Sequence, residues 1–254
     1  MEKIRTTVNG DISVVVGAAS GIGRATALLL SQRGATVILL DVNEVGITEL
    51  AEEIRAGGGQ SSAKVIDMSD HSNITSVIQE VGKEFGKIDS LVNAVGVTGP
   101  TGVNVEDVSW SDFQKTLTIN LFGAIWITQE VLRVMKPLKY GRIAQVASIA
   151  GKEGNPGMAP YNTSKAGLIG FVKGVSKEVA PFGILINAIA PAVIRTPINE
   201  NTTKETLAYM LAKIPMGRMG EVEEVAEAIA FMVSPECSFT TGFTFDVSGG
   251  RATY

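Results

Sequence analysis

The stretch VVVGAASGIGRATA, residues 14–27, places three glycines between an apolar run and a helical pattern. Gly17, Gly21 and Gly23 therefore follow a predicted strand and open a predicted helix. Glycine permits a tight turn and a close approach of the backbone to a pyrophosphate, whose charge favours a helix N-terminus. A glycine-rich turn by itself can also be a turn and nothing more. The remainder of the chain has to decide between these two interpretations.

A carboxylate follows the next predicted strand, at Asp41 in the segment ILLDV. This side chain can accept hydrogen bonds from both hydroxyls of an adenosine ribose, and it would repel the 2′-phosphate of NADP. Ser20 stands in the turn before Gly21, where no basic residue is present to bind that phosphate. Asp41 could instead cap the end of a strand. The spacing from Gly21 favours the ribose contact, and with it NAD as the cofactor.

Short apolar runs alternate with helical patterns along the whole chain. Predicted strands cover residues 12–16, 36–41, 63–67, 88–93, 141–147, 183–190 and 242–247, and predicted helices cover residues 22–33, 44–56, 70–85, 109–136, 160–180 and 221–233. Such alternation implies right-handed crossovers, and no linker or repeat marks a boundary. We predict one α/β domain over residues 1–254: a Rossmann-type, doubly wound parallel sheet of about seven strands with helices on both faces.

The long connection 192–220 has no clear strand character. It is too long for a plain loop, so we expect a short helix near residues 203–212 and a role as a cover over the substrate.

Further polar or special residues stand at the ends of predicted strands. They are Asp67, Asn93, Ser148 and Pro191. Ligands of open α/β sheets lie outside the carboxyl ends of the strands. A shared site at this edge of the sheet is more plausible than several separate accidents.

Composition excludes several other classes of site. The formal net charge is −4 and Lys and Arg are scattered, which argues against a nucleic-acid-binding face. Cys237 is the only cysteine and His71 the only histidine, so neither a disulfide nor a cysteine- or histidine-based metal site is expected. His71 could in principle serve a Ser-His-Asp triad, but its context SDHSN is typical of a solvated helix start.

The N-terminal segment MEKIRTTVNGDIS has no apolar core of a signal peptide, and no apolar run approaches the roughly 18 residues that span a membrane. We therefore expect a soluble, cytoplasmic protein without a membrane partner.

The segment YNTSK places Tyr161 and Lys165 four residues apart, on one face of a predicted helix. Alone, such a pair is a common surface arrangement. Ser148 precedes Tyr161 by thirteen residues. With the glycine turn, this combination resembles the short-chain dehydrogenase/reductase family over essentially the whole chain. GAASGIG, TINLFG, APAVIRTP and TGFTFDVSGG also carry the resemblance.

The resemblance implies a set of site residues. It implies that the catalytic residues are Ser148, Tyr161, Lys165 and Asn120. It implies a cofactor site formed by Gly17, Ser20, Gly21, Ile22, Gly23, Asp41, Asp67, Met68, Asn93, Gly96, Tyr161, Lys165, Pro191, Ile194 and Thr196.

The roles that follow are those of an acid–base pair beside a hydride carrier. A free tyrosine has a pKa of about 10, and we expect the Lys165 ammonium and the positive nicotinamide to lower that of Tyr161. Tyr161 would exchange a proton with the substrate oxygen, which Ser148 would orient. Lys165 would also hold the nicotinamide ribose, and Asn120 would help to hold a water leading from Lys165 to solvent.

Three positions depart from the family pattern. Val16-Gly17 stands where Thr-Gly is common, Asn93-Ala94-Val95-Gly96 replaces Asn-Asn-Ala-Gly, and Pro191-Ala192 replaces Pro-Gly. None of these changes removes a proton donor, so we expect a modified binding affinity and a catalytically active site.

The segments SIAGKEGNP and SGGRATY are similar to those of bacterial dehydrogenases of sugars and sugar acids. We therefore expect NAD-dependent interconversion of a secondary alcohol and a ketone on a sugar, a polyol or a 2-keto-3-deoxy sugar acid, in carbohydrate metabolism. A 3-oxoacyl-ACP reductase is the alternative. A catalytically silent dinucleotide sensor is a second alternative.

The family resemblance also implies a homotetramer. Trp126, Leu168 and Phe171 are expected on outer helix faces that a partner would cover, and Trp110 in the core or an interface. The tail 251–254 is expected to lie near a neighbouring active site, where it would help to close the pocket over an acidic sugar.

Overall fold

The structure is a computed structural model that describes residues 7–197 and 204–252. In these residues, seven parallel strands form one sheet in the order β3-β2-β1-β4-β5-β6-β7. The strands are β1 (Ile12–Val16), β2 (Thr36–Asp41), β3 (Gln60–Val65), β4 (Ser90–Asn93), β5 (Gly141–Val146), β6 (Ile184–Pro191) and β7 (Thr244–Val247). The order reverses between β1 and β4, and doubly wound sheets bind ligands at such a switch point.

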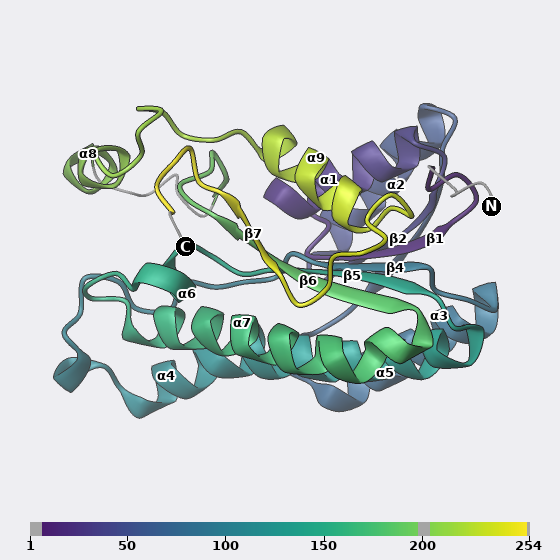
Figure 1. Cartoon of the computed structure of the whole chain (residues 1–254), viewed down its shortest axis with the longest axis horizontal. Coiled ribbons are helices and arrows are strands. Elements are labelled where there is room, and N and C mark those ends of the chain that lie inside the picture. The colour runs from purple at the N-terminus through teal and green to yellow at the C-terminus, as the bar shows by residue number, and fades with distance from the viewer. Residues whose placement is uncertain (1–6, 198–203, 253–254) are drawn as a thin grey trace.

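Helices cover both faces of the sheet, as Figure 1 shows. On one face lie α1 (Gly21–Gln32), α2 (Glu44–Ala56) and α9 (Val222–Met232). On the other lie α3 (His71–Phe85), α4 (Trp110–Leu117), α5 (Gly123–Leu138) and α7 (Ala159–Val179). The short helices α6 (Ala150–Glu153) and α8 (Lys204–Leu211) lie at one end of the molecule, and the one-turn 3-10 helices are Val105–Asp107 and Ala180–Phe182.

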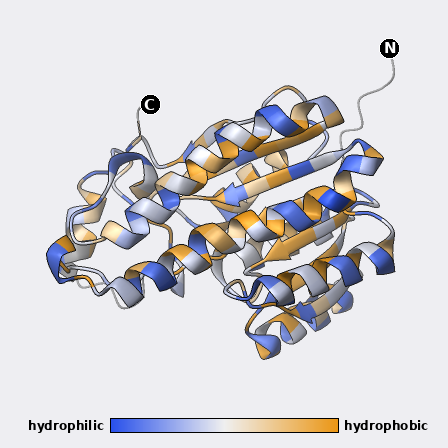
Figure 2. Ribbon diagram, turned by 90° about the horizontal axis from the view of Figure 1, so that it is seen from below, coloured by the Kyte–Doolittle hydropathy of each residue, from blue (hydrophilic) through white to orange (hydrophobic). Residues whose placement is uncertain are grey.

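The sheet separates two apolar cores. Val14 and Val16 of β1 are buried in the core beneath α3, α5 and α7, whereas Val15 points into the core beneath α1, α2 and α9. Both faces of the inner strands are therefore buried, which explains their continuous Val, Ile and Leu runs. Figure 2 shows apolar and polar residues interleaved along the helices, as one-sided burial requires.

The predicted α/β class and the doubly wound parallel sheet are confirmed, but some boundaries are wrong. β3 spans residues 60–65, not 63–67, because the polar Gln60, Ser61 and Ser62 form the outermost strand, which is only partly buried. The predicted helix 109–136 is two helices joined by a π-helical turn, Thr118–Phe122. Helix α8 lies where a helix near 203–212 was expected, although residues 198–203 lie outside the described residues.

The expectation that Leu168 faces outward is wrong, whereas the exposure of Trp110 excludes the core and leaves an interface as a prediction. Leu168 is 1% exposed and belongs to the core, because it follows the buried Ser164 and Lys165 by four and three residues on the same face of α7. Trp110 is 74% exposed at the start of α4, where it stacks on Phe113. Trp126 is partly buried against the core, and its ring lies at a tilt to that of His71 with centroids 5.2 Å apart. His71 is exposed at the start of α3, as its sequence context predicted.

None of the helices in the described ranges has the length and apolar content needed to cross a bilayer. The same residues contain no group of three or more His, Cys, Asp or Glu side chains that could hold a metal ion.

Candidate active site

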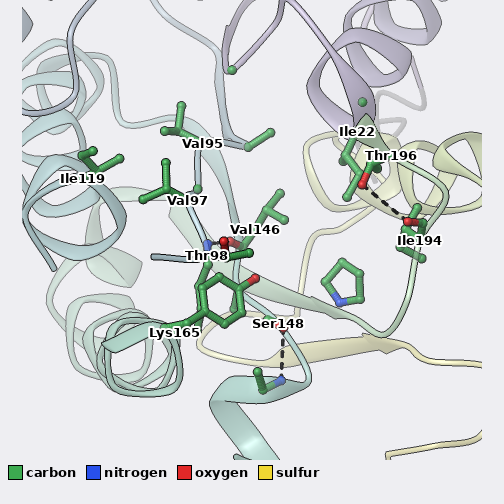
Figure 3. A pocket seen from close by; sticks show the side chains of 18 of the residues that line it. Ile22, Val95, Val97, Thr98, Ile119, Val146, Ser148, Lys165, Ile194 and Thr196 are labelled. Atoms are coloured by element: carbon green, nitrogen blue, oxygen red, sulfur yellow. Dashed lines mark hydrogen bonds between the residues drawn. The ribbon is translucent and has the colours of Figure 1, made fainter. Parts of the chain in front are cut away.

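A cavity of about 710 Å³ opens along the carboxyl edge of the sheet. Its walls come from the ends of β1, β2, β4, β5 and β6 and from the start of α7. In Figure 3, Ile22, Ile194 and Thr196 gather on one wall, and Val95, Val97 and Ile119 on another. The predicted site residues that line this cavity are Gly17, Ser20, Gly21, Ile22, Asp41, Asp67, Met68, Gly96, Ser148, Tyr161, Lys165, Pro191, Ile194 and Thr196.

The glycine turn brings the start of α1 to the cavity. Gly17 has φ +79°, and a Cβ atom there would lie 3.0 Å from the carbonyl carbon of Ala94. Gly21 has φ +53°, in the left-handed region that favours glycine. The first turn of α1 holds no acidic residue, and the N-cap Ser20 makes no side-chain capping bond. This helix start therefore presents N–H groups to an anion.

Gly23, the third residue of α1, is not among the residues that line the cavity. A Cβ atom at Gly23 would lie 2.0 Å from the carbonyl oxygen of Gly17, so only glycine lets α1 pack against the turn. This close packing is the role of the third glycine in dinucleotide-binding turns.

Asp41 lies at the end of β2, beside the glycine turn. Its carboxylate accepts hydrogen bonds from the backbone N–H groups of Ala19 (3.1 Å) and Asn43 (3.0 Å). These bonds fix the carboxylate at the cavity wall while leaving lone pairs for a ligand. Val42, the next residue, also lines the cavity and is 70% exposed. This end of the cavity is suited to a ribose and an adenine ring.

Ser148 and Tyr161 meet on the floor of the cavity. Ser148 Oγ accepts a hydrogen bond from the backbone N–H of Ala150 (3.1 Å), which leaves its own O–H free to donate. A hydrogen bond joins the side chains of Ser148 and Tyr161. Tyr161 is placed by α7, which begins at Ala159 with Pro160 in its first turn, a position where proline is tolerated.

Lys165 lies one turn further along α7, and its Nζ is 5.9 Å from the centroid of the Tyr161 ring. The side chain is 2% exposed, and its ammonium donates a hydrogen bond to the carbonyl oxygen of Val146 (2.8 Å). A Cβ atom at Gly96 would lie 3.1 Å from this Nζ. Glycine at position 96 therefore leaves room for the ammonium.

Desolvation dominates the titration of both groups. Burial raises the pKa of Tyr161, and the hydrogen bond with Ser148 lowers it in part. Burial lowers the pKa of Lys165 to about 8. The sequence led us to expect a lowered pKa for Tyr161, but in this arrangement the loss of water around the phenol is the larger effect.

Asn120 lies below the cavity wall, in the π-helical turn. Its Oδ1 accepts from the N–H of Val97 (2.8 Å), and its Nδ2 donates to the carbonyl of Val97 (2.9 Å) and to Ser164 Oγ (3.0 Å). Ser164 in turn donates to the carbonyl of Tyr161 (2.8 Å). Single π-helical turns often occur at functional sites. Asn120 thus joins the segment that follows β4 to the helix that carries Tyr161.

Asn93 is also buried beneath the cavity. Its Nδ2 donates to Gln145 Oε1 (2.9 Å), and Gln145 Nε2 donates to Thr128 Oγ1 (2.9 Å). Its Oδ1 accepts from the N–H of Val95 (3.3 Å), so it shapes the backbone at the cavity wall. Sequence reasoning missed Gln145, Thr128 and Ser164. A glutamine in the apolar run GRIAQVAS was the available signal.

At the chain end, Arg251 lies at the cavity of its own chain, whereas the sequence led us to expect the tail near a neighbouring active site. Arg251 lines the cavity of its own chain and bonds to Glu153 and Asn155, which follow Ser148. Residues 253–254 lie outside the described residues. A contact of the tail with a neighbouring subunit stays a prediction.

Comparison with known proteins identifies the family. The family model described as enoyl-(acyl carrier protein) reductase matches residues 17–252. A 2-dehydro-3-deoxy-L-rhamnonate dehydrogenase (NAD(+)) of Sphingomonas sp. strain SKA58 is 41% identical over 245 residues, which are 96% of this chain and 96% of the relative. The chain belongs to the short-chain dehydrogenase/reductase family. The predicted family and the predicted oxidoreductase class are both confirmed.

Two more short-chain dehydrogenases/reductases show the range of the similarity. A 3-oxoacyl-[acyl-carrier-protein] reductase of Thermotoga maritima is 38% identical over 244 residues, covering 96% of this chain and 98% of the relative. The crystal structure of an NAD⁺-bound xylitol dehydrogenase superposes with a TM-score of 0.90 at 32% identity, covering 95% of this chain and 99% of the other.

Proposed function

We propose that this protein is an NAD-dependent dehydrogenase that interconverts a secondary alcohol and a ketone on a small polar substrate: a sugar, a polyol or a 2-keto-3-deoxy sugar acid. One observation carries the proposal. Ser148, Tyr161 and Lys165 line the same cavity as the glycine turn and Asp41. A proton-transfer site and a dinucleotide site therefore share one space, as hydride transfer coupled to proton transfer requires.

Each side chain has a task in this reaction. Bound NAD supplies the nicotinamide carbon that accepts the hydride. Tyr161 takes the proton of the substrate hydroxyl, and Ser148 donates a hydrogen bond to the same oxygen and holds it in place. The Lys165 ammonium favours the phenolate of Tyr161 and binds the nicotinamide ribose. Asn120 holds the cavity wall at Val97 in a fixed position relative to the start of α7 through its hydrogen bonds to both.

The preference for NAD over NADP rests on Asp41. Its carboxylate is held at the cavity wall by two backbone N–H groups and faces the place of the adenosine ribose. A 2′-phosphate there would meet a negative charge, with Ser20 in place of a basic residue. The Sphingomonas relative, by its name, uses NAD(+), which supports the same cofactor here.

A 3-oxoacyl-ACP reductase is the alternative, because a relative with that name is 38% identical. Asp41 argues against it, since such reductases usually take NADPH. A catalytically silent sensor of dinucleotides is a further alternative. It has no need of a tyrosine and a lysine in the cavity, and both are present.

Several broader features belong to the same proposal. We infer a single domain in which residues 192–220 cover the substrate, a homotetrameric assembly, a cytoplasmic location and a role in carbohydrate metabolism. The expectation that the tail 251–254 lies near a neighbouring active site stays a prediction, because Arg251 lines the cavity of its own chain and residues 253–254 lie outside the described residues. The name of the Sphingomonas relative supports the role in carbohydrate metabolism, and the cavity-lining positions of Ile194 and Thr196 support the assignment of the segment that follows Pro191.

The experiment is a screen of sugars, polyols and sugar acids for NADH production, with NADH fluorescence as an independent measure of binding. Binding together with turnover supports the dehydrogenase. Binding without turnover on any alcohol supports the sensor, and turnover of 3-oxoacyl thioesters with NADPH alone supports the reductase.

A further inference from the structure

The side chain of Arg251 is almost fully buried, at 4% exposure, yet it lines the catalytic cavity. Asn155 and Met158 also line the cavity and lie between Ser148 and Tyr161 in the chain, and Asn155 contacts Arg251. A buried cation at the wall of a ligand cavity needs a partner or a function, because burial of an unpaired charge is costly.

The backbone before Arg251 is fixed by its own chain. Gly249 and Gly250 have φ +58° and +89°, which turn the chain back toward the cavity after β7. The carbonyl of Gly249 accepts from the N–H of Met216 (3.1 Å), and a Cβ atom at Gly250 would lie 3.2 Å from Pro215. In Figure 1 this yellow segment lies at the same end of the molecule as α6 and α8.

The guanidinium is oriented by two residues. Its Nε donates to Glu153 Oε2 (2.9 Å), and its Nη2 lies 2.9 Å from the same oxygen and donates to Asn155 Oδ1 (3.2 Å). A guanidinium has five N–H donors. The two on Nη1 make no hydrogen bond to any residue that the structure describes, so Arg251 keeps an oriented pair of donors.

Charge is distributed unevenly along the cavity. Among the described lining residues, Asp41 and Asp67 are the acidic ones; Asp41 ends β2 and Asp67 follows β3, at one edge of the sheet. The basic ones are Lys115, Lys165 and Arg251. Arg251 follows β7 at the opposite edge, and Ser148, after β5, lies between. An anionic group placed beyond Ser148 is therefore far from both carboxylates of the lining and close to a cation.

We propose that Arg251 determines substrate specificity by binding a carboxylate of the substrate, so that this enzyme acts on hydroxy or keto acids of sugars in preference to neutral polyols. The inference rests on the proposed function and narrows its substrate class. Arginine binds carboxylates through charge-assisted hydrogen bonds. Glu153 and Asn155 hold the guanidinium through Nε and Nη2 at the cavity wall, which leaves Nη1 for the carboxylate, and Tyr161 would act on an alcohol carbon further along the same molecule.

The test compares an acid and a neutral alcohol as substrates of Arg251→Gln. We use 2-dehydro-3-deoxy-L-rhamnonate and xylitol, with NAD saturating, and measure KM and kcat for each. The expected result is a KM for the acid raised roughly 10- to 100-fold, as for loss of hydrogen bonds to a charged group, with a much smaller change for xylitol. Arg251→Lys keeps the charge and should recover part of the loss.

Arg33→Gln is the control, because it also breaks an Arg–Glu ion pair, with Glu227, but this pair is exposed and lies outside the cavity. It should leave the acid-to-xylitol ratio of kcat/KM unchanged. If Arg251→Gln lowered kcat/KM equally for both substrates, Arg251 would have a structural role only, and the inference would be overturned. An unchanged KM for the acid would overturn it as well.

Failure of the inference can be separated from failure of the proposed function. If the wild type oxidises neither these two compounds nor any other sugar, polyol or sugar acid of the screen, the proposed function fails. The carboxylate site is then measured by calorimetric titration of the acid into the NADH-loaded Tyr161→Phe protein. Binding that disappears in Tyr161→Phe/Arg251→Gln supports the carboxylate site, and absence of binding to Tyr161→Phe contradicts it.

Discussion

Lys165 carries a buried charge, and its environment governs the electrostatics of the site. Val146 offers one carbonyl to the ammonium, and Gly96 leaves it room. Asp41 at the other end of the cavity is held in the same manner, by backbone groups. Asp41 was visible in the sequence through its spacing from Gly21, and Lys165 through its spacing from Tyr161. The partners that hold them are backbone atoms, which a residue pattern does not reveal.

Asp41→Ala should narrow the preference for NAD. Loss of the ribose hydrogen bonds should lower kcat/KM for NAD by roughly 10- to 100-fold, while NADP should gain or stay unchanged because a repulsion is removed. The measurement is kcat/KM for both cofactors in the wild type and the variant. Equal values for NAD and NADP in the wild type would contradict the assignment of Asp41.

The depressed pKa of Lys165 predicts a pH-dependent stability. Its folded pKa of about 8 lies below the ordinary 10.5, so burial of the ammonium opposes folding in full below about pH 8. This penalty falls as pH rises from about 8 toward 10.5, because the folded protein then gives up its proton first. Relative to Lys165→Met, the wild type should gain a few kcal/mol of unfolding free energy across that window. If the denaturant midpoints of the wild type and Lys165→Met changed with pH in the same way between about pH 7 and pH 9.5, the lowered pKa of a buried Lys165 would be contradicted.

At the scale of elements, the π-helical turn Thr118–Phe122 and the segment after β4 form one unit around Asn120. The sequence predicted Asn120 as a site residue but made 109–136 a single helix. Periodicity does not report a one-residue insertion into a helix whose two halves stay amphipathic. The start of β3 could not be predicted from apolar periodicity either, because Gln60, Ser61 and Ser62 lack an apolar pattern.

Gly96→Ala should damage catalysis more than folding. The new methyl would lie 3.1 Å from Lys165 Nζ and 3.8 Å from Asn120 Oδ1, so the ammonium must move. We expect a lower kcat and weaker NADH binding, with a stability loss of about 1–3 kcal/mol, typical of overpacking. Gly57→Ala is the control, because its Cβ would make ordinary contacts of 3.5 Å or more at the end of α2. Normal kinetics in Gly96→Ala would show that Lys165 is less constrained than proposed.

At the scale of the whole molecule, the seven-stranded order and the two-sided core follow from the alternation seen in the sequence. The edge location of Ser148, Asp41 and Asp67 follows from strand ends alone. Arg251 could not be placed in this way. Its position depends on the turn at Gly249 and Gly250 and on packing against Pro215, contacts between segments far apart in sequence.

The outer face of α5 and α7 is the surface proposed for assembly. It forms a shallow depression that includes Leu132, Phe171 and Gly174, and a Cβ atom at Gly174 would meet nothing within 4 Å. The small residue leaves space for a second copy of the helix across a two-fold axis.

Light scattering should therefore give the mass of four chains for the wild type at micromolar concentration. Gly174→Trp should give smaller species with an unchanged circular dichroism spectrum, because the added ring fills the space reserved for the partner helix. A monomer mass for the wild type would count against the tetramer.

The central claim is that Tyr161 transfers the proton in a site that also binds NAD, and Tyr161→Phe tests it most directly. The ring still packs, but the exchangeable proton is lost, and such acid–base catalysis is typically worth roughly a hundred- to ten-thousand-fold. On a substrate found in the alcohol screen, turnover should fall by that factor while the NADH dissociation constant from fluorescence stays within about twofold of the wild type. Near-normal turnover in Tyr161→Phe would contradict the account.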